Sequence, residues 1–155
     1  MHREPKILRD PLPYNPVNYL VDTNVFSELV KAKPDEQVLQ WLRQHEAELY
    51  VSSISIGELK RGIEGLTAGK RKTALQSWLK ELCHRMEGRI LSFNTSTAHF
   101  WGQLAARADK RGTTLPSIDS QLAATALRHD LTMVTRNVAD FKCTGVKVLN
   151  PFSLL

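Results

Sequence analysis

Short apolar runs alternate along the chain with longer segments in which apolar residues recur at every third or fourth position. Such short runs are typical of buried strands, and the longer segments are typical of amphipathic helices. The pattern predicts strands at 19–21, 49–51, 89–93, 131–135 and 146–149, and helices that begin near residues 23, 35, 55, 70, 95 and 117. Strands that alternate with helices indicate an α/β domain, here a three-layer α/β/α sandwich with a short, mainly parallel sheet.

The first 18 residues do not share this pattern. They hold four of the seven prolines and show no usable periodicity, so we predict an irregular leader at 1–18. A chain of 155 residues has the length of one domain, and no repeat or linker interrupts the later part. We therefore expect a single folded domain at 19–155.

Composition excludes several classes of protein. No apolar run reaches the ~20 residues that a membrane-spanning helix needs, and the first residues lack the apolar stretch of a secretory signal. Cys83 and Cys143 lie far apart and form no CxxC motif, so neither a disulfide framework nor a zinc site is indicated. We expect a protein of the reducing cytosol that has no membrane partner.

The net charge of +5 is unevenly distributed. Residues 19–59 carry seven acidic and three basic side chains, whereas residues 60–89 carry three acidic and eight basic ones. A basic region beside carboxylates suits an anionic ligand, because it attracts phosphate backbones. A solvated helix face explains the basic residues equally well, so both interpretations stay open.

Several polar residues directly follow the predicted strands or lie in the helices behind them: Asp22, Glu58, Asp119, Asn137 and Asp140. Ligands of open parallel sheets bind beyond the carboxyl ends of the strands, so these side chains can meet at one edge. Carboxylates gathered at one edge repel one another, and a divalent cation relieves that repulsion.

Each of these acids also has a structural explanation. Glu58 lies three residues after Ser55, which is the spacing of a helix capping box. Asp119 in a first helical turn is favoured by the helix dipole. Asp22 suits a helix cap, and Asp140 suits a turn. Taken together, however, the structural explanations require four coincidences at one edge of one sheet.

Four stretches resemble a known family, in the expected order and spacing. They read VDTNVFSEL at 21–29, SSISIGELKRGI at 52–63, LPSIDSQLAATAL at 115–127 and MVTRNVADF at 133–141. Over residues 19–151 the chain resembles the PIN-domain ribonucleases, specifically the VapC/FitB-like toxins of bacterial type II toxin–antitoxin modules. The resemblance implies the PIN fold for the domain at 19–155.

The resemblance also implies a site. The family's first three acids fall on Asp22, Glu58 and Asp119, which are thereby expected to bind Mg²⁺, or alternatively Mn²⁺, and to act in catalysis. The fourth position falls on Asn137 in the pattern of some relatives and on Asp140 in that of others, and Asp140 is kept as the fourth catalytic candidate. Accessory polar positions that orient the carboxylates or a bound water fall on Thr23, Asn24 and Thr135.

The function implied by the resemblance is a metal-dependent endoribonuclease that hydrolyses RNA phosphodiester bonds, leaving a 5′-phosphate and a 3′-hydroxyl. The implied partners are RNA, a cognate antitoxin protein and a second copy of the chain, with DNA contacted only through the antitoxin. Two alternatives stay open: a non-catalytic PIN-like module that binds RNA or regulates, and a DNA-binding regulator that uses the basic region at 60–89.

Overall fold

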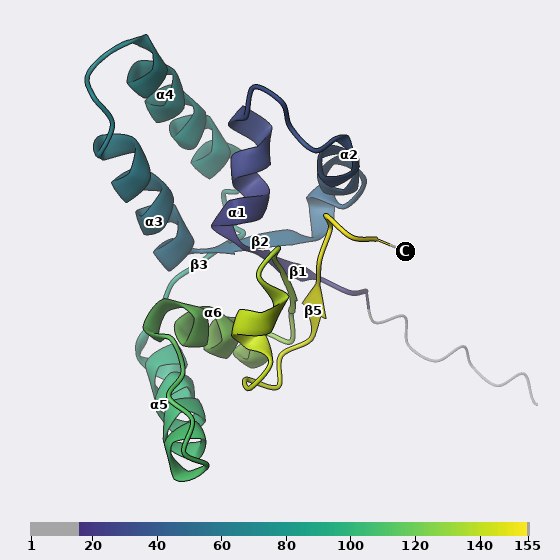
Figure 1. The fold of residues 1–155 in the computed structure, drawn as a ribbon, viewed down its shortest axis with the longest axis vertical. Coiled ribbons are helices and arrows are strands. Elements are labelled where there is room, and N and C mark those ends of the chain that lie inside the picture. The colour runs from purple at the N-terminus through teal and green to yellow at the C-terminus, as the bar shows by residue number, and fades with distance from the viewer. Residues whose placement is uncertain (1–15, 155) are drawn as a thin grey trace, which may run out of the picture.

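A computed structural model describes residues 16–154, so the predicted leader at 1–18 lies almost entirely outside the described residues. Five strands form one sheet in the order β3-β2-β1-β4-β5, and every neighbouring pair is parallel (Figure 1). The strands are β1 (Tyr19–Val21), β2 (Leu49–Ser52), β3 (Ile90–Leu91), β4 (Thr132–Val134) and β5 (Val148–Leu149).

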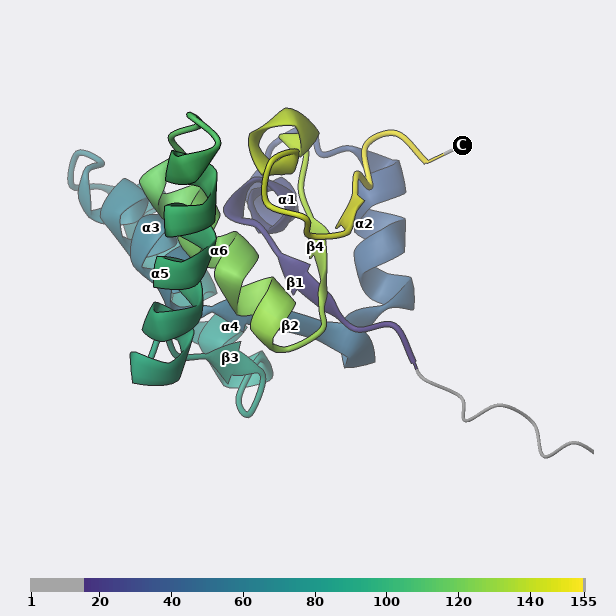
Figure 2. The same ribbon diagram turned by 90° about the horizontal axis from the view of Figure 1, so that it is seen from below.

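Helices lie on both faces of this sheet. They are α1 (Thr23–Phe26), α2 (Glu36–Gln44), α3 (Ser53–Glu64), α4 (Lys70–Arg85), α5 (Thr95–Lys110) and α6 (Ser117–Arg128), with short 3₁₀ turns η1 (Ser27–Val30), η2 (Glu46–Glu48) and η3 (Val138–Phe141). Helices α1 to α4 cover one face, and α5 and α6 cover the other (Figures 1 and 2). This arrangement confirms the predicted three-layer sandwich. Within residues 16–154, none of the helices has the length and apolarity to cross a membrane.

The core is divided in two by the sheet, because successive strand residues point to opposite faces. Val21 and Val134 pack among α1 to α4, whereas Leu20 and Met133 pack against α5 and α6. All four side chains are completely buried. Since helices cover both faces, the strands are largely apolar and do not alternate between apolar and polar residues, which is the signal that the sequence carried.

Side-chain caps mark where α2 and α3 begin. The Asp35 carboxylate accepts hydrogen bonds from the N–H groups of Gln37 and Val38 at the start of α2. The Ser52 hydroxyl accepts from the N–H of Ile54 at 3.1 Å, so α3 begins at Ser53. The predicted helix start near residue 55 was therefore wrong by two residues.

Some predicted positions differ from the observed ones. The last three strands are shorter than predicted, because pairing with a parallel neighbour extends over only two or three residues in each. Leu29 shares the helical apolar spacing of Val25 and Phe26, which predicts an inward side chain, but it is 44% exposed. It lies in η1, where the tighter 3₁₀ winding rotates its side chain out of the α-helical stripe. Ile118 shares the spacing of Leu122, which predicts the same, but it is exposed in the first turn of α6.

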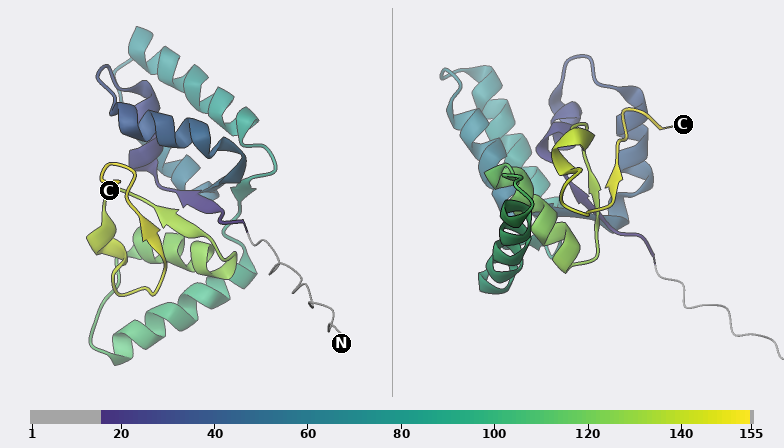
Figure 3. Two further views of the ribbon diagram at one scale, coloured as in Figure 1. Left: turned by 90° about the vertical axis from the view of Figure 1, so that its right-hand side faces the viewer. Right: turned by 60° about the horizontal axis from the view of Figure 1, so that its bottom comes forward.

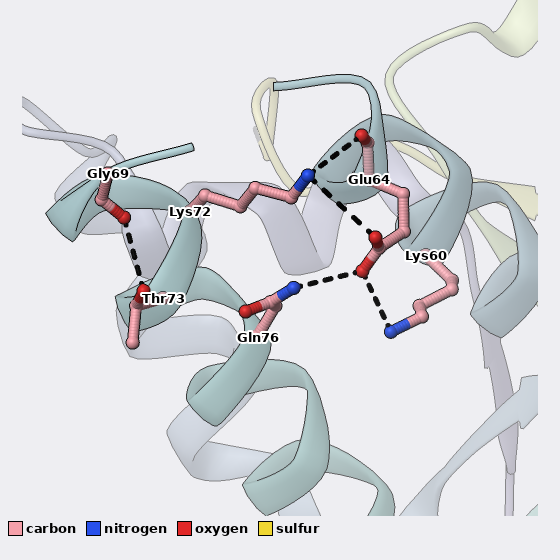
Figure 4. Close-up of polar contacts among 6 residues, drawn as sticks. All are labelled: Lys60, Glu64, Gly69, Lys72, Thr73 and Gln76. Carbon is pink, nitrogen blue, oxygen red and sulfur yellow. Dashed lines mark hydrogen bonds and ion pairs between the residues drawn. The ribbon is translucent and has the colours of Figure 1, made fainter. Parts of the chain in front are cut away.

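The basic region at 60–89 is partly neutralised within the chain. Glu64, at the end of α3, pairs with Lys60 on its own helix and with Lys72 on α4, and it accepts a hydrogen bond from Gln76 (Figure 4). Lys72 also donates to the backbone oxygen of Glu64 at 3.1 Å. These contacts tie α3 to α4, so two of the lysines have a structural role.

The strand order places a change of direction at the centre of the sheet. From β1 the chain moves outward through β2 to β3, and it returns to the other side of β1 to form β4 and then β5 (Figure 3). In open α/β sheets, ligands bind in the crevice beyond the carboxyl ends of strands at such a switch point. The carboxyl ends of β1 and β4 are therefore the first place to look for a site.

Candidate active site

The strands β1 and β4 end side by side. Val21 pairs with Val134, and the N–H of Asp22 donates to the carbonyl oxygen of Val134 at 2.9 Å. Asp22 and Thr135 are the next residues of the two strands, so they emerge together at the switch point. Asp22 is only 6% exposed, and Thr135 is completely buried.

Hydrogen bonds hold both oxygens of the Asp22 carboxylate. Its Oδ1 accepts the backbone N–H of Thr23 at 2.8 Å, which makes Asp22 the N-cap of α1. Its Oδ2 accepts the hydroxyl of Thr135 at 2.9 Å. A short helix cap and a neighbouring strand thus fix the side chain, and the capping role that the sequence allowed for Asp22 is real.

Asn24 connects this carboxylate to the loop after β4. Its Nδ2 donates to the Thr135 hydroxyl at 3.2 Å, with a longer contact of 3.4 Å to Asp22 Oδ2. Its Oδ1 accepts the backbone N–H of Arg136 at 3.1 Å. The backbone N–H of Asn137 donates to the Thr135 hydroxyl at 3.0 Å. Three accessory positions named from the sequence therefore contact Asp22 or its partner Thr135.

The other acids come from three separate elements. Glu58 is half-buried. It lies in the second turn of α3 and not in the first, because Ser52 and not Ser55 caps the helix. It therefore forms no capping box, and that structural explanation was wrong. Asp119 is half-buried in the first turn of α6, and Asp140 is exposed in η3.

These carboxylates disfavour one another's charge. Burial raises the pKa of Asp22, although hydrogen bonds from Thr135 and Thr23 oppose the rise, and the charge of Asp140 adds to it. Burial raises the pKa of Glu58, with further contributions from Asp22 and Asp119. Burial likewise raises the pKa of Asp119, with contributions from Asp140 and Asp22. Four acids that are distant in the sequence thus share one electrostatic environment.

No basic side chain offsets this charge within residues 16–154, where none of the four acids forms an ion pair. In the same residues, no three acidic, histidine or cysteine side chains lie close enough together to enclose a metal ion. The oxygen-only donor set nevertheless fits Mg²⁺ or Mn²⁺, which usually keep several waters and need few direct carboxylates. Repulsion between the acids is the force that such an ion would remove.

A groove begins beside the acids and runs along α3 and α4. Thr23 and Glu58 lie at its lining, together with apolar side chains such as Ile63 and Trp78. Its volume is about 470 Å³, and Lys31 and Arg71 are the basic side chains that line it.

Two features of this edge were not found from the sequence. Glu28 is 3% exposed, pairs with Lys31 and accepts the backbone N–H of Asp35 at 3.1 Å. The guanidinium carbon of Arg136 lies 4.1 Å from the centre of the Phe152 ring. Both residues lie in or near the motifs quoted above, but spacing along the chain gives no signal of either contact.

Comparison with known proteins agrees with this geometry. The sequence profile of the PIN domain matches residues 19–144. The VapC ribonuclease Y4jK of Sinorhizobium fredii is 37% identical over 135 residues, which are 86% of this chain and 96% of the relative. The toxin FitB of Neisseria gonorrhoeae is 36% identical over 135 residues, 86% of this chain and 97% of FitB.

Solved structures show the same fold. A chain in the structure of FitAB bound to the IR36 DNA fragment superposes with a TM-score of 0.83 at 33% identity, covering 88% of this chain and 97% of that one. A chain of FitAcB from Neisseria gonorrhoeae gives a TM-score of 0.82 at 36% identity, covering 88% and 99%. With its parallel sheet and its acids at the switch point, the protein belongs to the PIN-domain family, and its relatives include VapC and FitB toxins.

Proposed function

We propose that this PIN domain is a divalent-metal-dependent endoribonuclease and the toxin of a toxin–antitoxin pair. The observation that carries the proposal is the group of acids contributed by the end of β1 and by α3, α6 and η3. Burial raises the pKa of Asp22, Glu58 and Asp119, neighbouring carboxylates add to each rise, and none of these acids forms an ion pair within residues 16–154. Relatives named as ribonucleases, and one named as a tRNA(fMet)-specific endonuclease, support RNA as the substrate.

Asp22, Glu58 and Asp119 are the residues proposed to hold the ion, Mg²⁺ or alternatively Mn²⁺, partly through its coordinated waters and not as three direct ligands. When bound, such an ion lowers the pKa of a coordinated water and neutralises charge that develops on a phosphate. The chain's own contribution begins with Asp22, which Thr23 and Thr135 hold in one orientation. A carboxylate that is already fixed in this way pays little ordering entropy when a ligand binds.

Glu58 is the best candidate to orient the attacking water. It is half-buried, and its raised pKa makes it a better proton acceptor than an ordinary carboxylate. Its place on α3 beside the groove leaves its carboxylate accessible from solvent. Asp140 is exposed and acts on the other acids through its charge, so we assign it the supporting fourth position, with Asn137 as the alternative.

The partners are proposed from the relatives. Further solved structures of the same fold include VapBC2 from Rickettsia felis and VapBC from Salmonella typhimurium, both bound to DNA as FitAB is, and VapBC is a family of toxin–antitoxin systems. We propose that this chain likewise binds an antitoxin protein, meets DNA only through that antitoxin and forms a homodimer. A ribonuclease toxin acts where cellular RNA is found, which is consistent with a cytoplasmic location.

The test is cleavage of a fluorophore-labelled, structured RNA by the purified chain with Mg²⁺, with Mn²⁺ and with EDTA. We expect cleavage with either ion and none with EDTA. Asp119→Asn removes one proposed ligand and is expected to abolish cleavage. Glu64→Gln is the matched control, since it alters an acid that lies away from the site and is already paired.

Cleavage that persists in EDTA, or equal cleavage by Asp119→Asn, would contradict the proposed metal site. If the wild-type chain binds the RNA with either ion but never cuts it, the protein is the non-catalytic RNA-binding module that the sequence left open.

A further inference from the structure

Arg136 occupies the chain position directly after the hydrogen-bond network that holds Asp22. It directly follows Thr135, the residue whose hydroxyl holds Asp22, and its own backbone N–H donates to Asn24. Its side chain is exposed, and the guanidinium lies over the ring of Phe152. Backbone and side chain are therefore each held by a separate contact at the carboxyl edge of the sheet.

The guanidinium of Arg136 forms no ion pair with an acid within residues 16–154. Its charge makes only the smallest of the contributions that lower the pKa of Glu28, and Glu28 already has Lys31 and the N–H of Asp35 as partners. An arginine stacked on an aromatic ring keeps the N–H donors at the edge of its plane free for an anion.

Substrate binding at this site has an electrostatic difficulty. RNA carries a negative charge on every phosphate, and the site presents four carboxylates. A bound cation offsets part of the repulsion at the scissile phosphate, but the next phosphates along the strand need a positive partner of their own. Arg136 is the arginine that the structure places directly after a residue of the site network.

We propose that Arg136 binds a phosphate of the RNA strand beside the scissile one, and that Phe152 holds its guanidinium in place for this contact. The inference rests on the proposed ribonuclease function and adds to it a substrate-contacting residue. Arginine is suited to this role because its planar fork matches two phosphate oxygens at once.

The experiment measures RNA affinity and cleavage separately. A labelled single-stranded RNA is titrated with the Asp119→Asn protein, which is expected not to cut it, in Mg²⁺ over a range of salt concentrations, and steady-state cleavage is measured in the otherwise wild-type chain. Arg136→Gln is expected to weaken binding ~10-fold and to lower the slope of log affinity against log salt by ~0.7, the value for one phosphate contact on a single strand. In cleavage it is expected to raise KM by a similar factor with little change in kcat, because a flanking contact is the same in ground and transition states.

Two further variants separate charge from placement. Arg136→Lys keeps the charge but loses the stacked plane, so the salt slope is expected to stay while affinity falls ~3-fold, a smaller loss than removal of the whole charge. Phe152→Leu removes the ring and leaves Arg136 intact. It is likewise expected to keep the salt slope and to lower RNA affinity ~3-fold. Arg107→Gln changes an exposed arginine on α5 that donates only within its own helix, and it should leave both affinity and slope unchanged.

The outcomes are distinguishable. If the wild-type chain cleaves RNA and Arg136→Gln keeps its affinity and salt slope, the inference about Arg136 is wrong while the function stands. The same holds if Arg136→Gln lowers only the melting temperature, or weakens only binding of the antitoxin. If the wild-type chain neither cleaves nor binds RNA, both the function and the inference fail.

Discussion

Carboxylates in two regions of this protein experience opposite surroundings. At the sheet edge, Asp22, Glu58 and Asp119 have their pKa values raised by burial and by one another. Away from it, Glu64 lies between two lysines and Gln76, and hydrogen bonds from Gln76 and Lys60 lower its pKa (Figure 4). Glu64 is the last residue of the helix that carries Glu58, where the helix dipole disfavours an anion, so its lowered pKa comes from its neighbours and not from its position in the helix.

Glu28 shows that burial alone does not explain the difference. Burial by itself would raise the pKa of Glu28, but the hydrogen bonds from Lys31 and from the N–H of Asp35 outweigh it, and the pKa is lowered. The side chain of Asp22 is also almost inaccessible to solvent, but it lies deeper in the fold, its donors are neutral groups and not a cation, and its pKa is raised. An acid that a fold buries for its own stability receives a partner, whereas these acids are left with charge that a ligand can use.

The largest effect on RNA cleavage is expected from removing the charge of Asp22, the most buried of the four site acids. Asp22→Asn should lower the rate of RNA cleavage by ~10²-fold or more, since it removes a fixed carboxylate from the proposed ion site. Asparagine still caps a helix and accepts from Thr135, so circular dichroism should show an unchanged fold. A folded variant with wild-type activity would remove Asp22 from the site.

Glu58→Gln is expected to have the next largest effect. Glu58 caps no helix, so its replacement should change the free energy of unfolding by less than ~1 kcal/mol, as for surface-like changes. Turnover should nevertheless fall ~10²-fold, because a neutral amide accepts no proton from water. Denaturant melts and single-turnover cleavage measure the two quantities. Normal turnover in this variant would leave Glu58 without a catalytic role.

Neutralising an acid that has a basic partner and neutralising one that has none should change the free energy of unfolding of the metal-free protein in opposite directions. Glu28→Gln is expected to destabilise the fold at pH 7 by ~1 kcal/mol, the scale of one charged hydrogen bond. Because the pKa of Glu28 is lowered in the fold, its stabilisation is complete above the unfolded pKa and is lost as the pH falls through the folded pKa.

Asp119→Asn supplies the opposite arm of this comparison. Because the pKa of Asp119 is raised in the fold, its ionisation destabilises the protein progressively as the pH rises from the unfolded pKa through the folded one. Asp119→Asn should therefore be stabilising at pH 7, with the gain disappearing near pH ~4, where unfolded carboxyls protonate. Urea melts of wild type and both variants at pH 7 and pH ~4 measure these changes. If Glu28→Gln and Asp119→Asn both lose stability at pH 7, the proposed difference between paired and unpaired acids is wrong.

The smallest effect is expected at the fourth position. Asp140→Asn should raise the Mg²⁺ concentration for half-maximal cleavage a few-fold, because Asp140 contributes charge from an exposed place and not a fixed contact. Asn137→Ala should change it less, since a neutral amide oxygen binds a hard cation weakly. The measurement is a Mg²⁺ titration of the cleavage rate. The reverse ranking would assign the fourth position to Asn137.

The positions of the strands along the chain and the local placement of Asp22 and Asp119 were predictable because both rest on local patterns. Buried parallel strands are continuous apolar runs, and Asp22 and Asp119 sit at a strand end and in a first helical turn, which sequence shows directly. Leu29 was placed wrongly because a 3₁₀ turn interrupts the helical period. Ser55 was taken for a cap because it and Ser52 both precede acceptable helical sequence, and only the observed hydrogen bond distinguishes them.

The rest of the site could not be predicted because it depends on contacts across the sheet. Thr135 reaches Asp22 only because β4 pairs with β1, and no spacing rule connects residues so far apart. The stacking of Arg136 on Phe152 has the same origin, since it joins the loop after β4 to the turn after β5. Family resemblance named the first of these residues, and the tertiary structure was needed for the second.

The hydroxyl of Thr135 has a further consequence when its hydrogens are counted. A hydroxyl has one proton to donate and two lone pairs to accept with. Here Asn24 and the N–H of Asn137 occupy both lone pairs, and the single proton points to Oδ2 of Asp22. The direction of that proton is therefore fixed, so Thr135 can act toward Asp22 only as a donor. A donor that cannot reverse its role favours the ionised carboxylate, and this hydrogen bond opposes the rise in the pKa of Asp22 that burial causes.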